Sequence, residues 1–219
     1  MISPSSSEFM SNKMKININS INNKFDEPIF KAYSSVASHA IDRCIDEIKK
    51  LEPTCGLSYK KEVEGFICSI FCSLMNSVNN LKVQQVFDAL RMTFTHYASG
   101  GLYQLYTQQE NGEWYPEIIL TDILIPNDIS SLDEIITLYR GCNKSEYENK
   151  CFRQAWTTSL DVARSFAYEK YLGYDGFNIE DRVVLVTRYS RDHVLFSNQS
   201  VEYEVVINTN MLGDVRLHV

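Results

Sequence analysis

Three polar features stand out on otherwise apolar segments in the second half of the chain. Arg140 closes the run EIITLYRG, three consecutive hydroxyl residues follow a tryptophan in WTTSLDVARSFA, and two glutamates lie two residues apart in VEYEVVI. On a strand, Arg140 shares a face with Ile136 and Leu138, so its guanidinium either reaches water at the strand end or holds an anion. The planar fork of arginine matches the oxygens of a phosphate or carboxylate.

The hydroxyl triplet opens a segment with helical periodicity. Thr158 and Asp161 have the spacing of a capping box, in which Thr158 caps the helix and Asp161 lies at the positive end of the helix dipole. A cap needs one hydroxyl residue. Thr157 and Ser159 are therefore either incidental or part of a site around the same helix start.

Two interpretations apply to the glutamates. If VEYEVVI is a strand throughout, Glu202, Glu204 and Val206 share one face, and the strand is an edge strand with a solvated acidic face. The apolar Val206 favours a second interpretation, in which both faces of the strand end are covered. Glu204 then lies near low dielectric, where a carboxylate needs a cationic or hydrogen-bonding partner.

In this order, the three features resemble those of mono-ADP-ribosyltransferases of the arginine–serine–glutamate class, to which many bacterial toxins and effectors belong. Those proteins carry an arginine on a strand, a Ser-Thr-Ser triplet before a helix of small residues, and a Glu-x-Glu pair before a β-branched strand. The resemblance covers residues 100–219. Thr157 replaces the first serine of the triplet, which keeps the hydroxyl and adds a methyl group.

The resemblance implies that NAD is the substrate and that no metal takes part. It implies that Arg140 grips a phosphate of NAD, that Thr157 orients Glu204, and that Glu204 faces the sugar cation that develops as nicotinamide leaves. Glu202 would bind an incoming guanidinium, because glutamate at that position goes with arginine as the acceptor. The residues expected to contact NAD are Arg140, Gly141, Thr157, Thr158, Ser159, Phe166 and Glu204.

Other assignments stay open at this point. Some such enzymes modify nucleic-acid bases, which the net charge of −7 disfavours, although IKKLEPTCGLSYKK and the Lys- and Asn-rich N-terminus allow a local basic track. A non-catalytic interaction module, whose helical half binds a partner, is the other alternative, and the Thr157 substitution is its support. A toxic transferase would also imply an antitoxin or immunity protein in its producer.

The elements that must position these residues change character at the SGG run that ends at residue 101. Before it, apolar residues recur at three- and four-residue steps, which predicts helices; after it, short segments rich in β-branched and aromatic residues predict strands with one or two helices. We expect an α+β fold with a flexible polar N-terminal arm (1–27), a helical subdomain (28–98) and a catalytic core (99–219). By resemblance, the core is a mixed, mainly antiparallel split sheet of the ADP-ribosyltransferase type.

Composition sets further bounds. The chain has 219 residues, of which 44% are hydrophobic, enough for a packed core and inconsistent with bulk disorder. Its six cysteines are irregularly spaced without a Cys-x-x-Cys pair, which predicts free thiols in a reducing compartment. The N-terminus lacks the apolar core of a signal peptide, so we expect a cytoplasmic protein without membrane contact, with delivery into a target cell as an open alternative.

Overall fold

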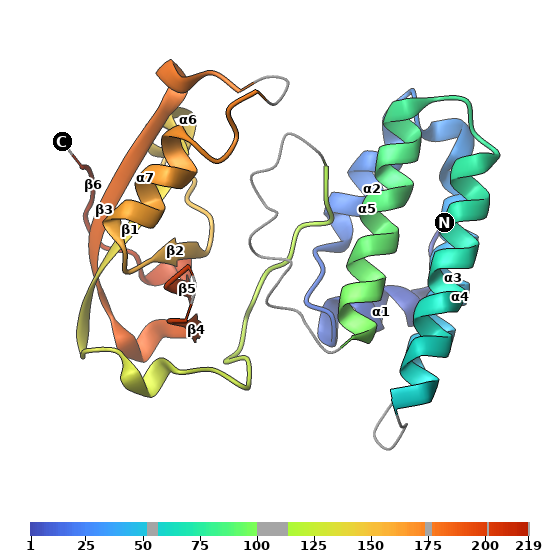
Figure 1. The fold of residues 1–219 in the computed structure, drawn as a ribbon, viewed down its shortest axis with the longest axis horizontal. Helices are drawn as coiled ribbons and strands as arrows, with labels where there is room; N and C mark the ends of the chain where they lie inside the picture. Colours follow the sequence, from blue (N-terminus) through green and yellow to red (C-terminus); the bar gives the residue numbers. More distant parts are fainter. Residues whose placement is uncertain (52–56, 100–113, 174–176, 201, 219) are drawn as a thin grey trace. The chain divides into compact units, whose positions relative to one another are not determined.

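The structure, a computed structural model, describes residues 1–51, 57–99, 114–173, 177–200 and 202–218. The chain divides into two compact units, Met1–Ile119 and Leu120–Val219, and each is described by itself. The first is helical, and the second combines helices with an antiparallel sheet (Figure 1). The fold is therefore α+β, as the sequence predicts. Over the described residues, no helix combines the length and the apolar character that crossing a bilayer requires.

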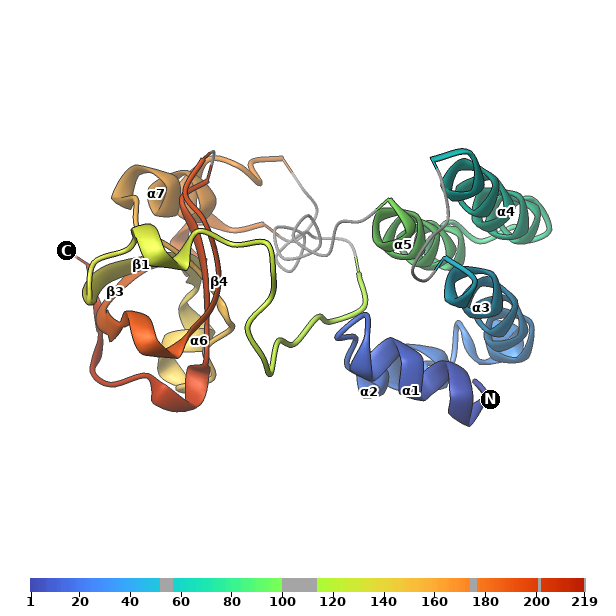
Figure 2. The same ribbon diagram turned by 90° about the horizontal axis from the view of Figure 1, so that it is seen from below.

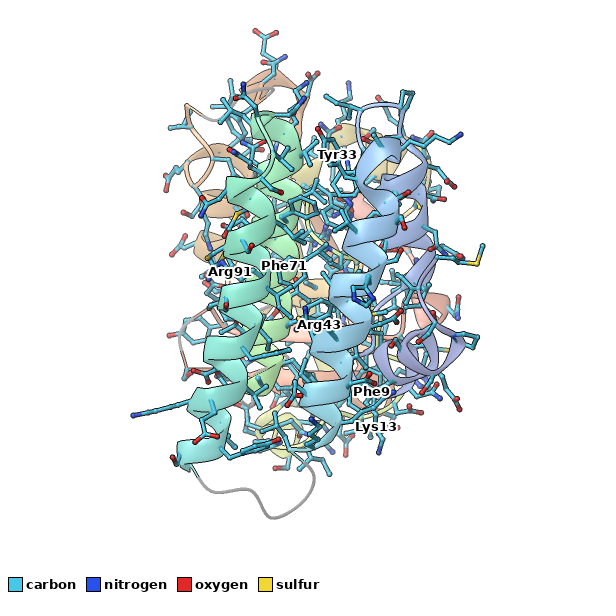
Figure 3. All side chains as sticks on the ribbon, turned by 90° about the vertical axis from the view of Figure 1, so that its right-hand side faces the viewer. Phe9, Lys13, Tyr33, Arg43, Phe71 and Arg91 are labelled. Atoms are coloured by element: carbon cyan, nitrogen blue, oxygen red, sulfur yellow. The ribbon has the colours of Figure 1, made fainter. Side chains whose placement is uncertain are left out.

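The helices of the first unit pack through the apolar faces that the sequence periodicity predicts. Figure 3 shows Phe71 in the space between α4 and α3, and its ring centroid lies 5.9 Å from that of Phe94 on α5. Arg43 extends from α3 toward α4, with its guanidinium 5.4 Å from the centre of the Phe66 ring. The bounds of the helices are α1 (Pro4–Asn12), α2 (Ile18–Asp26), α3 (Ser34–Lys49), α4 (Leu57–Asn76) and α5 (Leu81–Ala98).

The first 27 residues are not a flexible arm, and that prediction is wrong. They form helices α1 and α2, which begin at side-chain caps from Ser3 and Asn17. Met10, Met14 and Ile21 have no exposed surface. The Ser and Asn residues that predicted a solvated arm instead supply helix caps, and a few widely spaced apolar side chains are enough to bury the segment.

The boundary between the two units also differs from the predicted one at residues 98 and 99. Ile118 pairs with Ile16 in an isolated antiparallel bridge, and the backbone N–H of Ile119 donates to the Lys15 carbonyl at 2.8 Å. Residues 117–119 therefore belong to the helical unit. The strand predicted from YPEIILTDILI is limited to this bridge. The strand predicted from GLYQLYT lies outside the described residues.

The second unit is built on six strands in the order β4-β5-β2-β1-β3-β6, with antiparallel pairing between neighbours. Over the described residues the expected mixed, split sheet is thus one continuous antiparallel sheet. Strand β1 joins β4, β5 and β2 on one side to β3 and β6 on the other, because it pairs along its whole length with β3 and, through Tyr139, with β2. The strands are β1 (Ile135–Asn143), β2 (Ala155–Thr157), β3 (Arg182–Ser190), β4 (Val194–Asn198), β5 (Glu204–Ile207) and β6 (Val215–Leu217).

Helices α6 (Lys144–Glu148) and α7 (Leu160–Tyr168) lie on opposite sides of β1 and β3, as Figure 2 shows. Along β1, Leu138 belongs to the core that α6 covers, whereas Tyr139 packs with the residues of α7. We call these the α6 face and the α7 face. A Cβ on Gly141 would lie 2.1 Å from the Ala163 carbonyl oxygen, so the close approach of α7 to β1 requires glycine there. Short 3₁₀ helices lie at Lys31–Tyr33, Ile129–Ser131, Ile179–Asp181, Arg191–His193 and Thr209–Met211.

Candidate active site on the sheet

A row of directly paired residues crosses the α7 face of the sheet where α7 begins. Asn198 of β4 pairs with Glu204, Glu204 pairs with Thr157, and Thr157 pairs with Tyr139 of β1. Paired residues in an antiparallel sheet point to the same face with their Cβ atoms about 5 Å apart. The structure therefore brings together Thr157 and Glu204, two predicted site residues that are far apart in the sequence.

The Thr157 hydroxyl connects the helix start to the chain that leads into β5. Its side chain is buried, and its Oγ1 donates to the Glu202 carbonyl oxygen at 2.8 Å and accepts from the Ser159 backbone N–H at 3.0 Å. The resemblance implied that Thr157 orients the Glu204 carboxylate. In the structure the hydroxyl instead fixes the backbone two residues before Glu204, because its single proton is used there.

The other two hydroxyls of the triplet also have partners of their own. Ser159, and not Thr158, is the N-cap of α7, with its Oγ accepting from the Val162 N–H at 3.4 Å. The cap lies one residue later than predicted because Thr158 contacts the loop between β4 and β5. Its Oγ1 donates to Gln199 Oε1 at 2.7 Å, and Gln199 Nε2 donates to the Glu204 carbonyl oxygen at 3.2 Å. The triplet thus couples the start of α7 to β5.

Glu204 is the carboxyl group whose environment is most unusual. Burial, followed by the negative charge of Glu202, raises the pKa of Glu204 to about 8, although Lys170 acts in the opposite direction. Within the described residues, no hydrogen-bond donor is paired with its carboxylate. A carboxyl group that titrates near neutral pH beside a helix start is typical of a catalytic site.

Glu202 does not share a strand with Glu204, contrary to the expected alternation. Strand β5 begins at Glu204, and Tyr203 has a φ of 49°, in the left-handed region that interrupts extended backbone. The Glu202 carboxylate accepts a hydrogen bond from Lys170 Nζ at 2.7 Å. The same Nζ lies 3.9 Å from the centre of the Phe166 ring. Phe166, which was expected to contact NAD, therefore makes a cation–π contact with Lys170 in the structure.

Arg140 lies on the opposite face of the sheet from this group. Because Gly141 faces α7, the alternation of the strand points Arg140 to the α6 face. There its Nε and Nη2 each donate to one carboxylate oxygen of Glu146 at 3.0 Å, and Nη1 donates to the Ala155 carbonyl oxygen at 2.5 Å. The structure does not bring the Arg140 guanidinium to Glu204; it ties β1 to β2 instead.

Three neighbours of the site were missed by sequence reasoning. Tyr139 precedes Arg140, so strand alternation alone would have placed it on the face opposite the arginine, whereas its position next to Thr157 comes from the strand register. Gln199 lies in the loop between β4 and β5, and Lys170 follows the end of α7. The sequence around Gln199 and Lys170 carries no signal that they contact Thr158 and Glu202, respectively. Those contacts depend on the tertiary positions of the β4–β5 loop and of the end of α7.

Comparison of the chain with protein-family models, with curated proteins and with solved structures found no match in any of the three. The chemistry must therefore be inferred from the geometry. A carboxyl group with a raised pKa interacts with a second carboxylate and with a lysine that contacts an aromatic ring, and it is paired with the residue two positions before a helix N-cap. Over the residues that the structure describes, no cluster of three or more His, Cys, Asp or Glu side chains is placed to hold a metal ion. Such a site can stabilise a developing positive charge and accept a proton near neutral pH.

Proposed function

We propose that the second unit is an NAD-dependent mono-ADP-ribosyltransferase, a glycosyltransferase that uses NAD as substrate. The observation that supports this most directly is the register that pairs Thr157 with Glu204, with Glu202 held against Thr157 through its backbone. Two residues that the resemblance assigns to one site are thus paired in the sheet, and the backbone of a third is hydrogen-bonded to one of them. A toxin or effector role, with a neutralising partner in the producer, stays a prediction.

In the proposed reaction the bond between the ribose anomeric carbon and the nicotinamide nitrogen breaks. Its electron pair leaves with nicotinamide and neutralises the positive charge of that ring. The sugar develops cationic character, which an ionised Glu204 carboxylate stabilises by charge and by a hydrogen bond from a ribose hydroxyl, as glycosidase carboxylates do. Because burial raises the pKa of Glu204 to about 8, the rate depends on its ionised fraction near neutral pH.

Glu202 serves the acceptor in this proposal. Its side chain is 32% exposed and can therefore be reached by a macromolecule. It accepts hydrogen bonds from an incoming guanidinium and takes up the proton that the nitrogen loses as it forms the new bond to the anomeric carbon. We therefore favour a protein arginine as the acceptor.

Arg140 takes a different role from the one implied by the resemblance. Its guanidinium is bound to Glu146 and to the Ala155 carbonyl oxygen, and contact with a phosphate of NAD would require it to leave that carboxylate. In this proposal Arg140 positions β2, on which Thr157 lies two residues after Ala155. It thereby acts on the site through the strand.

The test compares wild type, Glu204→Gln and a matched control, Glu148→Gln. Glu148 is an α6 glutamate of the same unit whose side chain is 58% exposed. Two activities are measured, the release of nicotinamide from NAD and the labelling of protein or RNA in a whole-cell lysate with tagged NAD. We expect protein labelling by wild type and the control, and a loss of about 10²–10³-fold in Glu204→Gln with the circular dichroism spectrum unchanged. Full activity of Glu204→Gln, or a wild type that leaves NAD intact, contradicts the proposal.

A further inference from the structure

We propose that Lys170 occupies the place of the acceptor: its ammonium group fills a cation subsite made by the Glu202 carboxylate and the Phe166 ring, and the guanidinium of the acceptor must displace it. The inference rests on the proposed function for what the subsite is used for. The ability of the subsite to bind a cation does not depend on NAD chemistry and can be measured by itself.

Two different attractions converge on the Lys170 ammonium. Its Nζ lies 2.7 Å from Glu202 Oε1 and 3.9 Å from the centre of the Phe166 ring. A carboxylate beside an aromatic face is a combination by which proteins hold ammonium and guanidinium groups. The side chains of Lys170 and Glu202 are 38% and 32% exposed, so an external cation reaches the subsite without unfolding of the chain.

The backbone that carries the two walls of the subsite is anchored, whereas the occupant is the end of a long side chain. The Glu202 backbone is anchored by the hydrogen bond from the Thr157 hydroxyl to its carbonyl oxygen, and Phe166 belongs to the second turn of α7, with its ring 6.2 Å from that of Tyr171. The Lys170 ammonium is held only at the end of a flexible four-carbon side chain. A subsite on an anchored backbone, occupied by a tethered cation, is suited to exchange.

The chemistry of the subsite selects which cations displace the lysine. An ammonium is a compact point charge, and an external alkylammonium makes the same contacts as Lys170 without the advantage of being tethered. A planar guanidinium can donate two parallel hydrogen bonds to Glu202 and stack on Phe166 at the same time. Lys170 is therefore a specificity-determining residue that excludes amines and admits guanidinium groups.

The exchange also keeps a positive charge beside Glu204. Glu202 and Lys170 are the charged groups that act on Glu204. Removal of Lys170 without an acceptor would leave two carboxyl groups close together without a cation, whereas an arriving guanidinium replaces the lost charge. In the resting protein the lysine thus stabilises the site that the acceptor later completes.

The size of the competition follows from the two contacts. A partly exposed ion pair and an exposed cation–π contact each favour the bound cation by about two- to fivefold. Together they favour the occupied subsite by a factor of about 5–30 in equilibrium constant. Removal of the internal competitor should therefore tighten the binding of an external guanidinium by at least about fivefold.

The test is a titration with butylguanidinium in the absence of NAD, followed by NMR, with butylammonium as the second probe. Wild type, Lys170→Met and Lys170→Gln are compared with Arg164→Met, which also removes a positive charge from α7 at a side chain that is 53% exposed. We expect butylguanidinium to bind at least about fivefold more tightly to both Lys170 variants, and Arg164→Met to match wild type. Addition of Glu202→Gln to Lys170→Met should abolish the gain.

The proposal is overturned if both Lys170 variants bind butylguanidinium no more tightly than wild type, or if Arg164→Met produces the same gain. Equal binding of the two probes to wild type would refute the selection of guanidinium groups. Tighter binding in variants of a protein that never cleaves NAD would support the subsite and refute the proposed function. Cleavage of NAD by wild type, without tighter butylguanidinium binding in the Lys170 variants, would support the proposed function and refute the subsite.

Discussion

Replacement of Glu204 by glutamine should stabilise the folded second unit at alkaline pH. The pKa of this carboxyl group is raised from 4.5 to about 8 in the folded protein, where burial and the charge of Glu202 oppose ionisation and Lys170 favours it. Between these pH values the folded state keeps a proton that the unfolded state has lost. The stability associated with Glu204 is therefore complete below pH 4.5 and is lost as the pH rises through about 8. Glutamine carries no ionisable proton and removes this loss.

The magnitude follows from the two pKa values. Each tenfold difference in proton affinity corresponds to about 1.4 kcal/mol, so the interval from 4.5 to about 8 sets an upper limit of about 5 kcal/mol above pH 8. At pH 5 the same argument leaves a difference below about 1 kcal/mol. We expect Glu204→Gln to gain a few kcal/mol at pH 9 relative to wild type and little at pH 5, because local relaxation reduces the upper limit.

Urea unfolding at pH 5, 7 and 9 measures this effect, provided that the signal comes from the second unit, to which Glu204 belongs. The chain has two tryptophans, and Trp156, buried in the second unit, reports on it alone in a Trp114→Phe background. Glu148→Gln is the control for the loss of an exposed carboxylate. A gain that does not increase from pH 5 to pH 9, or a variant less stable than wild type at pH 9, would refute the assignment of a half-buried, protonated Glu204.

Two further predictions concern catalysis and packing. The rate of NAD cleavage should rise about tenfold between pH 7 and pH 9, because Glu204, with a pKa of about 8, is about 9% ionised at the lower pH and about 91% at the higher; a steady-state pH profile that is flat over this range would contradict its role. Gly141→Ala should lower the free energy of unfolding by about 1–3 kcal/mol or more, since the new methyl meets the α7 backbone, whereas Gly213→Ala, where a Cβ meets nothing within 4 Å, should leave the urea midpoint nearly unchanged.

Much of the fold could be predicted because the spacing of apolar residues reports which face of an element is buried. The helical periodicity of the first half corresponds to α3, α4 and α5, and the α+β class is confirmed. The N-terminal segment was predicted wrongly for the opposite reason. Its average composition is polar, and no local pattern reveals that Met10, Met14 and Ile21 meet a complementary surface.

The same distinction between local patterns and contacts of distant segments applies to the site. The sequence by itself determined that Thr157 precedes a capped helix and that the apolar residues after Glu204 form a strand, since caps and strand patterns are local properties. Only the tertiary structure decided that these two residues are paired, because strand register depends on contacts between distant segments. It also decided that the left-handed backbone at Tyr203 turns Glu202 toward Lys170, and that Arg140 points to the other face. Side-chain direction on a sheet follows from register and backbone conformation, and both are set by the packing of the whole unit.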